Sequence, residues 1–577
     1  MYRRMKVVNR IGRHGQVKPF TRREFIRNGI GATAGAASIA KSENAFSLLG
    51  GATGNGGRKP NVILILADDM GFSDVGCFGS SVNTPNIDGL AADGLRFTEF
   101  YNCGRCCPSR ASLMTGLYSH QSGFGLMTGD LHLPAYTGDL SDRCVTIAEA
   151  MRTGGYHTLM CGKWHLTPAE LPSKHNWPLQ RGFEKFVGTI EGAGSYFDPV
   201  TLARDNTPIR ADKNFYYTDS IAENASSLIE EYSHKQDPFF LYAAFTAPHW
   251  PLQAHPDDIA KYEKHFTDGW DAHREERYHR MIELGIIDPK WKLSPRDPRV
   301  PPWPETPHKE WEARRMAVYA AQIEALDRGI GQIRAKVKES GIEDNTLIMF
   351  LSDNGGNLEE LTPSWRGYLF VPHETLDGKI VRLGNNPSVM PGAADTYQSY
   401  GLPWANVSNT PFRLYKHFAN EGGISTPLIA CWPGVTQKNA ITNQTGHVMD
   451  IMATCLDLAK MPYPTTYGGR EIIPLEGKSL LPILQGKQRE PHEAIYWEHE
   501  GNRAVRHGKW KLVSSFPNYW ELHDMEADRT ELNNLVGEYP EIVQEMDSMY
   551  RSWARRVGVA RWPISGKQED EDYLRHD

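Results

Sequence analysis

The chain has 577 residues, of which 40% are hydrophobic and 23% are charged, and its formal net charge at pH 7 is −7. A chain of this length is too long to fold around a single compact core, so we expect one large domain and one smaller domain. The negative charge argues against a nucleic-acid binder or other general polyanion binder. Eight cysteines in a chain of this length do not indicate a disulfide scaffold.

The N-terminal segment is predicted to be an export signal. Arg22 and Arg23 are followed by the apolar pair at residues 25–26, and a weakly apolar run covers residues 29–40. This order is typical of a twin-arginine signal peptide, which we place at residues 1–45, with a disordered basic tail as the alternative. The run is too short for a membrane helix. We therefore expect the Tat translocase to export the protein to the periplasm or the cell exterior, without stable membrane insertion.

A glycine-rich linker at residues 46–58 precedes a predicted catalytic domain at residues 59–488. Short continuous apolar runs alternate there with helical patterns, which predicts an α/β fold with a large mixed, mostly parallel sheet sandwiched by helices. Residues 312–337 have apolar side chains at helical spacing and should form one of the covering helices. The clearest strands are expected at residues 61–66, 156–161, 239–244, 346–351 and 427–431.

Polar side chains directly follow four of these strands. Ligands of open α/β sheets bind beyond the carboxyl ends of the strands, so we expect these side chains on one rim. Three carboxylates and an amide oxygen favour Ca²⁺ or Mg²⁺ over zinc, whereas turns that only cap helices are the alternative. The residues are Asp68 and Asp69 after the first strand, Lys163 and His165 after the second, His249 after the third, and Asp353 and Asn354 after the fourth.

Basic side chains near this rim suit an anionic substrate. Arg110 offers a rigid fork to tetrahedral oxyanions, and Lys163 and Lys416 offer compact positive charges. His165 and His249 have ordinary pKa values that suit proton transfer near neutrality. With a metal ion, this set would stabilise transfer at sulfur or phosphorus.

A cysteine cluster at residues 103–107 carries the most specific motif. Residues 106–110 read Cys-Cys-Pro-Ser-Arg, continue with Leu-Met-Thr-Gly at 113–116, and resemble the signature of the type I sulfatases. In that family a separate maturation enzyme oxidises the first cysteine of Cys-x-Pro-x-Arg to Cα-formylglycine, which implies that Cys106 is modified. A zinc site would need more ligand pairs than this one. A disulfide between Cys103 and Cys107 and an unmodified thiol nucleophile remain alternatives.

Other segments resemble the same family from residue 59 to residue 535, with the bacterial arylsulfatase branch as the closest match. Residues 155–165 look like its second signature. The resemblance implies the fold shared by alkaline phosphatases and sulfatases. It also implies a Ca²⁺ ion held by Asp68, Asp69, Asp353, Asn354 and the modified Cys106. Further matching segments lie at residues 181–183, 247–249, 352–356, 409–427, 510–512 and 521–524.

The resemblance also implies how the reaction proceeds. A hydrated formylglycine has two hydroxyl groups on one carbon, so one can attack sulfur and the other can later expel sulfate by elimination. The implied roles are a base for Asp353, a proton acceptor for His165, contacts to the leaving oxygen for His249 and Lys416, and anchoring of formylglycine and sulfate for Arg110 and Lys163.

Residues 489–577 are predicted to form a small C-terminal subdomain. Short antiparallel strands are expected at residues 494–497, 502–505 and 509–513, followed by a helix at 538–557. Before it, residues 255–311 are rich in aromatic residues and proline. This segment either forms a wall of the substrate pocket or is an insertion that packs on the core.

The sequence as a whole predicts an exported sulfatase with formylglycine at position 106. Its substrate would be a small-molecule or glycan sulfate ester, that is, an aryl sulfate or a sulfated carbohydrate. A phosphonate or phosphate ester hydrolase on the same scaffold is the alternative enzyme. The non-enzymatic alternative is a sulfated-glycan-binding protein that keeps the pocket and never modifies the cysteine.

Overall fold

The computed structural model describes residues 58–169, 173–192, 194–365 and 371–564. The predicted signal peptide, and all of the predicted linker except Arg58, lie outside these residues. Among the helices that are described, none has both the length and the apolar character needed to cross a membrane.

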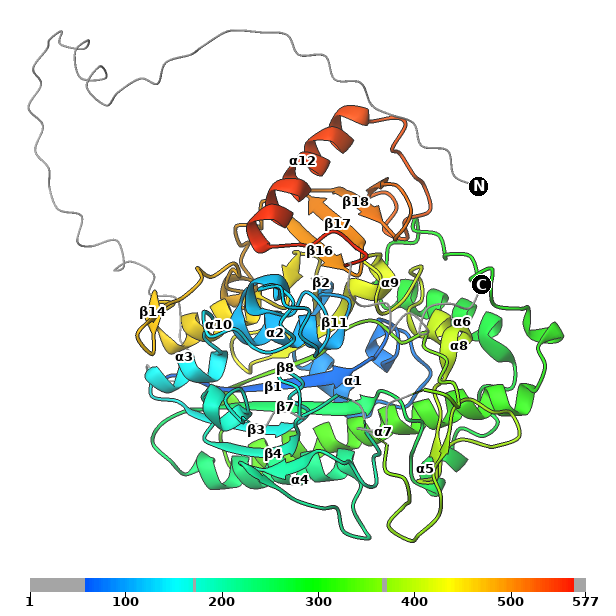
Figure 1. Ribbon diagram of the computed structural model, residues 1–577, viewed down its shortest axis with the longest axis horizontal. Coiled ribbons are helices and arrows are strands. Elements are labelled where there is room, and N and C mark those ends of the chain that lie inside the picture. Colours follow the sequence, from blue (N-terminus) through cyan, green and yellow to red (C-terminus); the bar gives the residue numbers. More distant parts are fainter. Residues whose placement is uncertain (1–57, 170–172, 193, 366–370, 565–577) are drawn as a thin grey trace, which may run out of the picture. The chain divides into compact units, whose positions relative to one another are not determined.

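A mixed sheet of 11 strands forms the centre of the described fold (Figure 1). Its strands in chain order are β1 (Asn61–Asp68), β2 (Leu95–Tyr101), β3 (His157–Gly162), β4 (Lys185–Thr189), β5 (Leu202–Arg204), β6 (Thr207–Pro208), β7 (Phe239–Pro248), β8 (Thr346–Ser352), β11 (Ser425–Cys431), β12 (Ala440–Thr442) and β13 (Gly446–His447). They are arranged in the order β12-β2-β11-β8-β1-β7-β3-β4-β5-β6, and β13 also pairs with β2. Two separate strand pairs are formed by β9 (Arg382–Leu383) with β10 (Thr396–Tyr397), and by β14 (Thr466–Tyr467) with β15 (Arg470–Glu471).

The direction of the strands confirms the predicted mostly parallel sheet. The five neighbours β8, β1, β7, β3 and β4 run parallel to one another. In contrast, β11 is antiparallel to both β8 and β2. All five strands expected from the sequence are present, and β8, β1, β7 and β3, the strands with polar endings, lie side by side.

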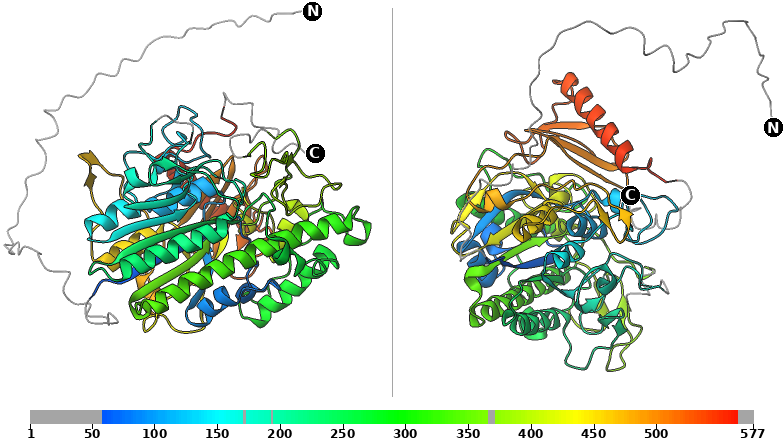
Figure 2. Two further views of the ribbon diagram at one scale, coloured as in Figure 1. Left: turned by 90° about the horizontal axis from the view of Figure 1, so that it is seen from below. Right: turned by 90° about the vertical axis from the view of Figure 1, so that its left-hand side faces the viewer.

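Helices cover both faces of this sheet. The helices are α1 (Pro85–Ala92), α2 (Cys106–Thr115), α3 (Ile147–Thr153), α4 (Tyr217–Ser233), α5 (Pro256–Ala260), α6 (Gly269–Glu283), α7 (Lys309–Glu339), α8 (Gly401–Ser408), α9 (Glu421–Ile424), α10 (Asp450–Ala459), α11 (Leu481–Leu484) and α12 (Pro540–Val557). Alternate residues of β1 enter two different cores: Val62 and Leu64 pack with residues of α2, α3 and α10, whereas Ile63 and Ile65 pack with residues of α1, α4 and α7. Figure 2 shows the long α7, the predicted covering helix, running along one face.

The C-terminal part is a separate four-stranded antiparallel sheet with a helix against it. Its strands are β16 (Ile495–His499), β17 (Asn502–His507), β18 (Trp510–Ser514) and β19 (Glu521–Asp524). Met546 and Trp553 of α12 pack with Val505 and Leu512 of the sheet (orange to red in Figure 1). The predicted antiparallel sheet and helix are confirmed, and β19 is a strand that the sequence pattern did not indicate.

The aromatic segment at residues 255–311 contains α5 and α6. Trp270 is buried and packs edge-on against Trp404 of α8, with ring centroids 5.7 Å apart, and Trp303 contacts both of these rings. These contacts favour the packing interpretation for the tryptophans of this segment.

Candidate active site

The seven polar residues predicted at the strand ends lie at one edge of the sheet. Because β8, β1, β7 and β3 are parallel neighbours, their carboxyl ends share that edge, as expected for an α/β ligand site. Lys163 Nζ lies 2.5 Å from Asp68 Oδ2, and His249 Nε2 lies 3.2 Å from Asp69 Oδ2. Each of the seven is no more than 5% exposed. The structure thus brings together side chains that are up to about 290 residues apart in sequence.

Helix α2 adds the cysteine and the arginine. Cys106 is its first residue, and Sγ lies 3.5 Å from Asp68 Oδ1 and 3.6 Å from Asp69 Oδ1. Arg110 is one helical turn further on and therefore faces the same side of the helix. Its Nε and Nη2 each lie 2.9 Å from Asp353 Oδ2. The spacing of Cys-x-Pro-x-Arg therefore places the thiol and the guanidinium together over the carboxylates.

Lys416 reaches the same centre from the loop between α8 and α9. Its Nζ lies 2.8 Å from Asp69 Oδ2 and 3.5 Å from His249 Nε2. All residues predicted for the site, including Lys416, are therefore in one buried cluster (Asp68, Asp69, Cys106, Arg110, Lys163, His165, His249, Asp353, Asn354 and Lys416).

The carboxylates of the cluster differ in their electrostatics. Burial would raise the pKa of Asp68, but Lys163, His249 and Arg110 together hold it well below its usual value. The pKa of Asp353 is instead raised to about 7, first by burial and then by the charge of Asp68, which outweigh Arg110. At Asp353, burial and the charge of Asp68 therefore outweigh the neighbouring cations, whereas at Asp68 the cations outweigh burial.

The carboxylate and amide oxygens of the cluster could bind a divalent cation. Ligand atoms of Asp68, Asp69, Cys106 and His249 all lie within 4.8 Å of one another. The amide oxygen of Asn354 is buried and accepts no hydrogen bond from the described residues, so it is available as a further ligand. Oxygen donors of this kind suit a hard cation such as Ca²⁺.

The environment of His249 fixes its tautomer. Nδ1 lies 2.6 Å from the carbonyl oxygen of Trp250, which can only accept, so Nδ1 carries a hydrogen and Nε2 faces Asp69 and Lys416. Burial lowers the pKa of His249, although the charge of Asp69 opposes the change. The ring can therefore donate from Nε2 only as the imidazolium.

His165 has a different environment. Its Nε2 lies 3.8 Å from Glu191 Oε2, and its Nδ1 is buried without a hydrogen-bond partner among the described residues. Burial, followed by the charges of Lys163 and Arg110, holds its pKa well below 6.5. His165 is therefore neutral near pH 7 and can accept a proton.

Comparison with known families agrees with this geometry. A family model described as Sulfatase matches residues 60–461, which is more than half of the chain. The chain belongs to the sulfatase family. A second model, described as N-sulphoglucosamine sulphohydrolase, C-terminal, matches residues 412–554 of this sulfatase.

Individual relatives support the same assignment. An uncharacterized sulfatase of Schizosaccharomyces pombe is 34% identical over 88% of this chain and 95% of its own length. An arylsulfatase of Klebsiella aerogenes is 32% identical over 77% of this chain and 96% of its own length. The crystal structure of Ps i-CgsB shares the fold, with a TM-score of 0.62 and 24% identity over 86% of this chain and 93% of that chain. The sulfatase is thus an enzyme that hydrolyses sulfate esters.

Three further polar residues around the site were missed by the sequence analysis. Asn357 Nδ2 donates to Asp69 Oδ2 at 2.9 Å and to Glu359 Oε2 at 2.9 Å. Glu359 in turn pairs with Arg105, whose Nη1 lies 3.0 Å from its Oε1. Their positions in the sequence could have indicated them. Arg105 immediately precedes Cys106, and Asn357 and Glu359 follow Asp353 and Asn354 in the same loop.

The other two cysteines of the cluster lie outside the site in this sulfatase. Cys103 and Cys107 are both free, so the structure does not support a disulfide between them. The Cys103 Sγ donates to Ser112 Oγ at 3.2 Å, and Cys107 is buried in the hydrophobic core. Only Cys106 faces the carboxylates.

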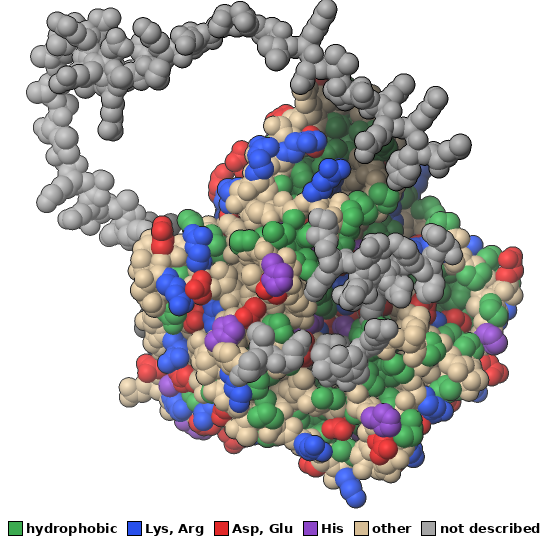
Figure 3. Space-filling model, viewed as in Figure 1, with side chains coloured by type: hydrophobic (Ala, Val, Ile, Leu, Met, Phe, Trp, Pro, Cys, Tyr) green, Lys and Arg blue, Asp and Glu red, His purple; other side chains and the backbone are tan. Residues whose placement is uncertain are grey.

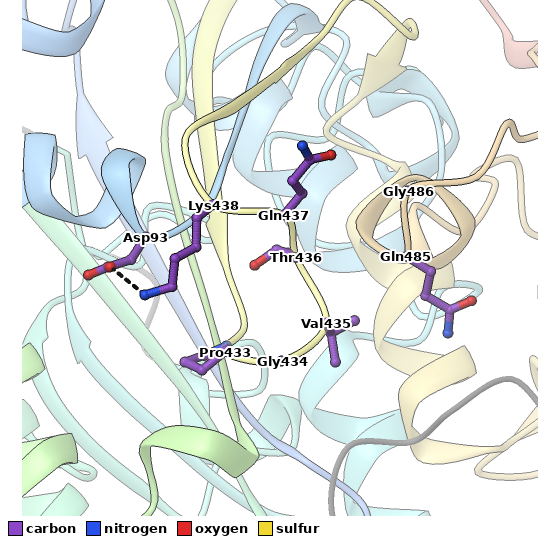
Figure 4. Close-up of a pocket in the computed structure, with 9 residues that line it drawn as sticks. All are labelled: Asp93, Pro433, Gly434, Val435, Thr436, Gln437, Lys438, Gln485 and Gly486. Carbon is purple, nitrogen blue, oxygen red and sulfur yellow. Dashed lines mark hydrogen bonds and ion pairs between the residues drawn. The ribbon is translucent and has the colours of Figure 1, made fainter.

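A surface pocket elsewhere contains none of the predicted site residues. It has a volume of about 410 Å³ and is lined by Asp93, by the loop after β11 and by Gln485 and Gly486 (Figure 4). Within it, Lys438 Nζ lies 3.3 Å from Asp93 Oδ1. On the face drawn in Figure 3, the described Lys and Arg side chains are interspersed with Asp and Glu side chains. The buried cluster therefore remains the candidate active site.

Proposed function

We propose that this sulfatase hydrolyses sulfate monoesters with a Cα-formylglycine formed from Cys106 and a Ca²⁺ ion held by Asp68, Asp69, Asp353 and Asn354. The observation that carries the proposal is the position of the Cys106 thiol, which contacts two carboxylates in a buried cup of lysine and arginine side chains. Its Sγ stands where the oxygen atoms of a hydrated aldehyde would lie after modification.

The unmodified thiol is poorly suited to act as the nucleophile. Burial raises the pKa of Cys106 well above 9, and Lys416 and Lys163 offset this only in part. The reactive thiolate is therefore scarce near neutral pH. A hydrated formylglycine would instead supply two hydroxyl groups, one for attack on sulfur and one for release of sulfate.

The metal would add positive charge beside Asp353, whose ionised form burial disfavours. Ca²⁺ would stabilise the ionised carboxylates and polarise the sulfate group. Arg110 contacts Asp353, and Lys163 contacts Asp68, the carboxylate that the Cys106 thiol also faces. These contacts support the anchoring role proposed for the two cations.

Protons would be handled by three residues with different pKa values. Asp353, which would be ionised when it holds the metal, would accept the proton of the attacking hydroxyl group. Neutral His165 would accept the proton released when sulfate leaves. On the leaving oxygen, Lys416 would donate a charged hydrogen bond. His249 would donate a proton from Nε2 in its protonated form, which the charge of Asp69 at 3.2 Å favours and burial opposes.

The remaining parts of the proposal concern export and partners. We propose a catalytic domain at residues 59–488 and a C-terminal subdomain from residue 489. A formylglycine-generating enzyme would modify Cys106, and the Tat translocase would export the folded protein to the periplasm or the cell exterior. The substrate would be an aryl sulfate or a sulfated carbohydrate.

Mass spectrometry of the peptide that contains residue 106, together with turnover assays, tests the proposal. Purified protein that was produced with the maturation enzyme should contain the aldehyde and should release sulfate from nitrophenyl sulfate faster than phosphate from nitrophenyl phosphate. Cys107→Ala is the matched control: it should keep both properties, whereas Cys106→Ala should lose them. Aldehyde-bearing protein that cleaves phosphate or phosphonate esters but no sulfate ester would contradict the proposal.

A further inference from the structure

A second cluster of metal-ligating side chains lies beside the Lys416 loop. His417 follows Lys416, His499 is the last residue of β16, and Glu500 lies in the turn that leads to β17. Their ligand atoms all lie within 4.8 Å of one another. We propose that His417, His499 and Glu500 bind a divalent transition-metal ion of the Zn²⁺ class, and we call them the hairpin site.

The geometry of the hairpin site is close to that of a metal site with two imidazoles and one carboxylate. His417 Nδ1 lies 2.9 Å from Glu500 Oε2, and His499 Nε2 lies 4.0 Å from Glu500 Oε1. The two imidazole rings are 5.4 Å apart and nearly perpendicular. Zinc bonds of roughly 2.0–2.1 Å in a tetrahedral arrangement separate neighbouring ligand atoms by about 3.3 Å. The two distances to Glu500, 2.9 Å and 4.0 Å, lie on either side of that spacing.

His499 gives an independent indication of a ligand. Its side chain is 3% exposed, and neither Nδ1 nor Nε2 has a hydrogen-bond partner among the described residues. A buried polar group that makes no hydrogen bond costs about 1–3 kcal/mol, so an uncompensated ring of this kind is unusual.

The donor set separates this site from the carboxylate cluster. Two imidazole nitrogens and one carboxylate oxygen suit Zn²⁺, Co²⁺ or Ni²⁺, whereas Ca²⁺ prefers oxygen ligands alone. The hairpin site would therefore bind its metal in the presence of Ca²⁺ and independently of the modification of Cys106. It goes beyond the proposed function in both respects.

The hairpin site lies between the Lys416 loop and the C-terminal sheet, so a metal bound there would affect the structure around the active site. The backbone nitrogen of His417 donates to Gly104 O at 2.7 Å, so this loop already contacts the segment before Cys106. A metal bound by His417, His499 and Glu500 would link the loop that carries Lys416 to the C-terminal sheet. It would thereby hold Lys416 in place over the carboxylates.

Metal titration of the matured full-length protein tests this inference. Chelator-treated protein in excess Ca²⁺ should bind one Zn²⁺ per chain by equilibrium dialysis, and Co²⁺ should give the visible absorption of a tetrahedral site. Loss of one direct ligand should weaken Zn²⁺ binding by at least ~100-fold, since even partners that only support a ligand contribute 10–100-fold. His499→Ala and Glu500→Gln should both show this loss.

Two control variants make the result specific. His132→Ala removes an imidazole that is 88% exposed and should leave Zn²⁺ binding unchanged. Asp68→Asn should weaken Ca²⁺ binding and leave Zn²⁺ binding unchanged, which separates the hairpin site from the proposed calcium site. The inference is wrong if the wild-type protein binds no Zn²⁺, or if folded His499→Ala and Glu500→Gln proteins, checked by thermal unfolding, bind Zn²⁺ as the wild type does.

Discussion

Asp353 and Glu421 are two fully buried carboxyl groups whose surroundings shift their pKa values in opposite directions. Glu421 accepts from Lys511 Nζ at 2.7 Å and from Arg529 Nε at 3.0 Å. Burial alone would raise the pKa of Glu421, but these two cations and Arg506 lower it to about 2. Asp353 has Arg110 as its neighbour, but burial and the charge of Asp68 raise its pKa to about 7.

The difference distinguishes a structural ion network from a binding site. Around Glu421, which joins the sheet edge to the C-terminal strands, the cations are sufficient to stabilise the ionised carboxylate. Around Asp353, burial and the charge of Asp68 outweigh the stabilisation that Arg110 and Lys163 give to the ionised carboxylate. A buried carboxyl group with a strongly raised pKa, such as Asp353, is typical of a site that binds an ion or a substrate. Removing each carboxylate should therefore have opposite consequences for activity and stability.

The largest effect is expected for Asp353→Asn. Loss of a metal ligand and of the proposed base should lower kcat/KM for nitrophenyl sulfate by at least ~10³-fold. The free energy of unfolding of the metal-free protein at pH 7 should rise rather than fall, because a carboxyl group whose pKa is raised to about 7 on folding destabilises the folded state at that pH and the neutral amide does not. Steady-state assays and urea unfolding measure the two quantities. Full activity with normal calcium content would remove Asp353 from the site.

Glu421→Gln should show the reverse pattern. Breaking a buried ion pair leaves Arg529 with an uncompensated charge, so the free energy of unfolding should fall by about 3–5 kcal/mol. The folded fraction should keep its calcium and most of its activity. Glu521→Gln is the control: its side chain is 32% exposed and pairs with Arg413, so its loss should cost about 1 kcal/mol or less. Equal losses in the two variants would refute the comparison.

The sequence predicted the site better than it predicted the balance of charges within it. The strand endings were recognisable because buried parallel strands are continuous apolar runs, and the first polar residue after each run marks the rim. Asn357 was missed because it lies further along the loop after β8, and Arg105 was missed because it precedes a helix and does not follow a strand. The raised pKa of Asp353 could not be predicted, since it depends on a distance to Asp68 that only the folded chain defines.

Acid should weaken the Glu421 network in a defined pH window. The pKa of Glu421 is lowered from 4.5 to about 2 on folding, so its stabilising contribution is complete above pH 4.5 and is lost as the pH falls toward 2. By pH 3 the loss should be about 2 kcal/mol. The stability difference between wild type and Glu421→Gln, from urea unfolding at pH 6 and pH 3, should shrink by that amount. A difference independent of pH would show that the cations do not control this carboxylate.

Calcium binding should also weaken in acid, but in a pH window near neutrality, because Asp353 retains a proton that the metal must displace. Its pKa is about 7 in the metal-free protein, so the carboxyl group is largely protonated at pH 6 and ionised at pH 8. The metal binds the ionised form, and the apparent affinity for Ca²⁺ should therefore be about 10-fold weaker at pH 6 than at pH 8. Titrations of chelator-treated protein at the two pH values measure the change, and Glu421→Gln should show the same dependence. Asp353→Asn should bind weakly and without this pH dependence, because its amide has no proton to release. Equal wild-type affinities at pH 6 and pH 8 would mean that Asp353 is already ionised without the metal, and the contrast with Glu421 would then fail.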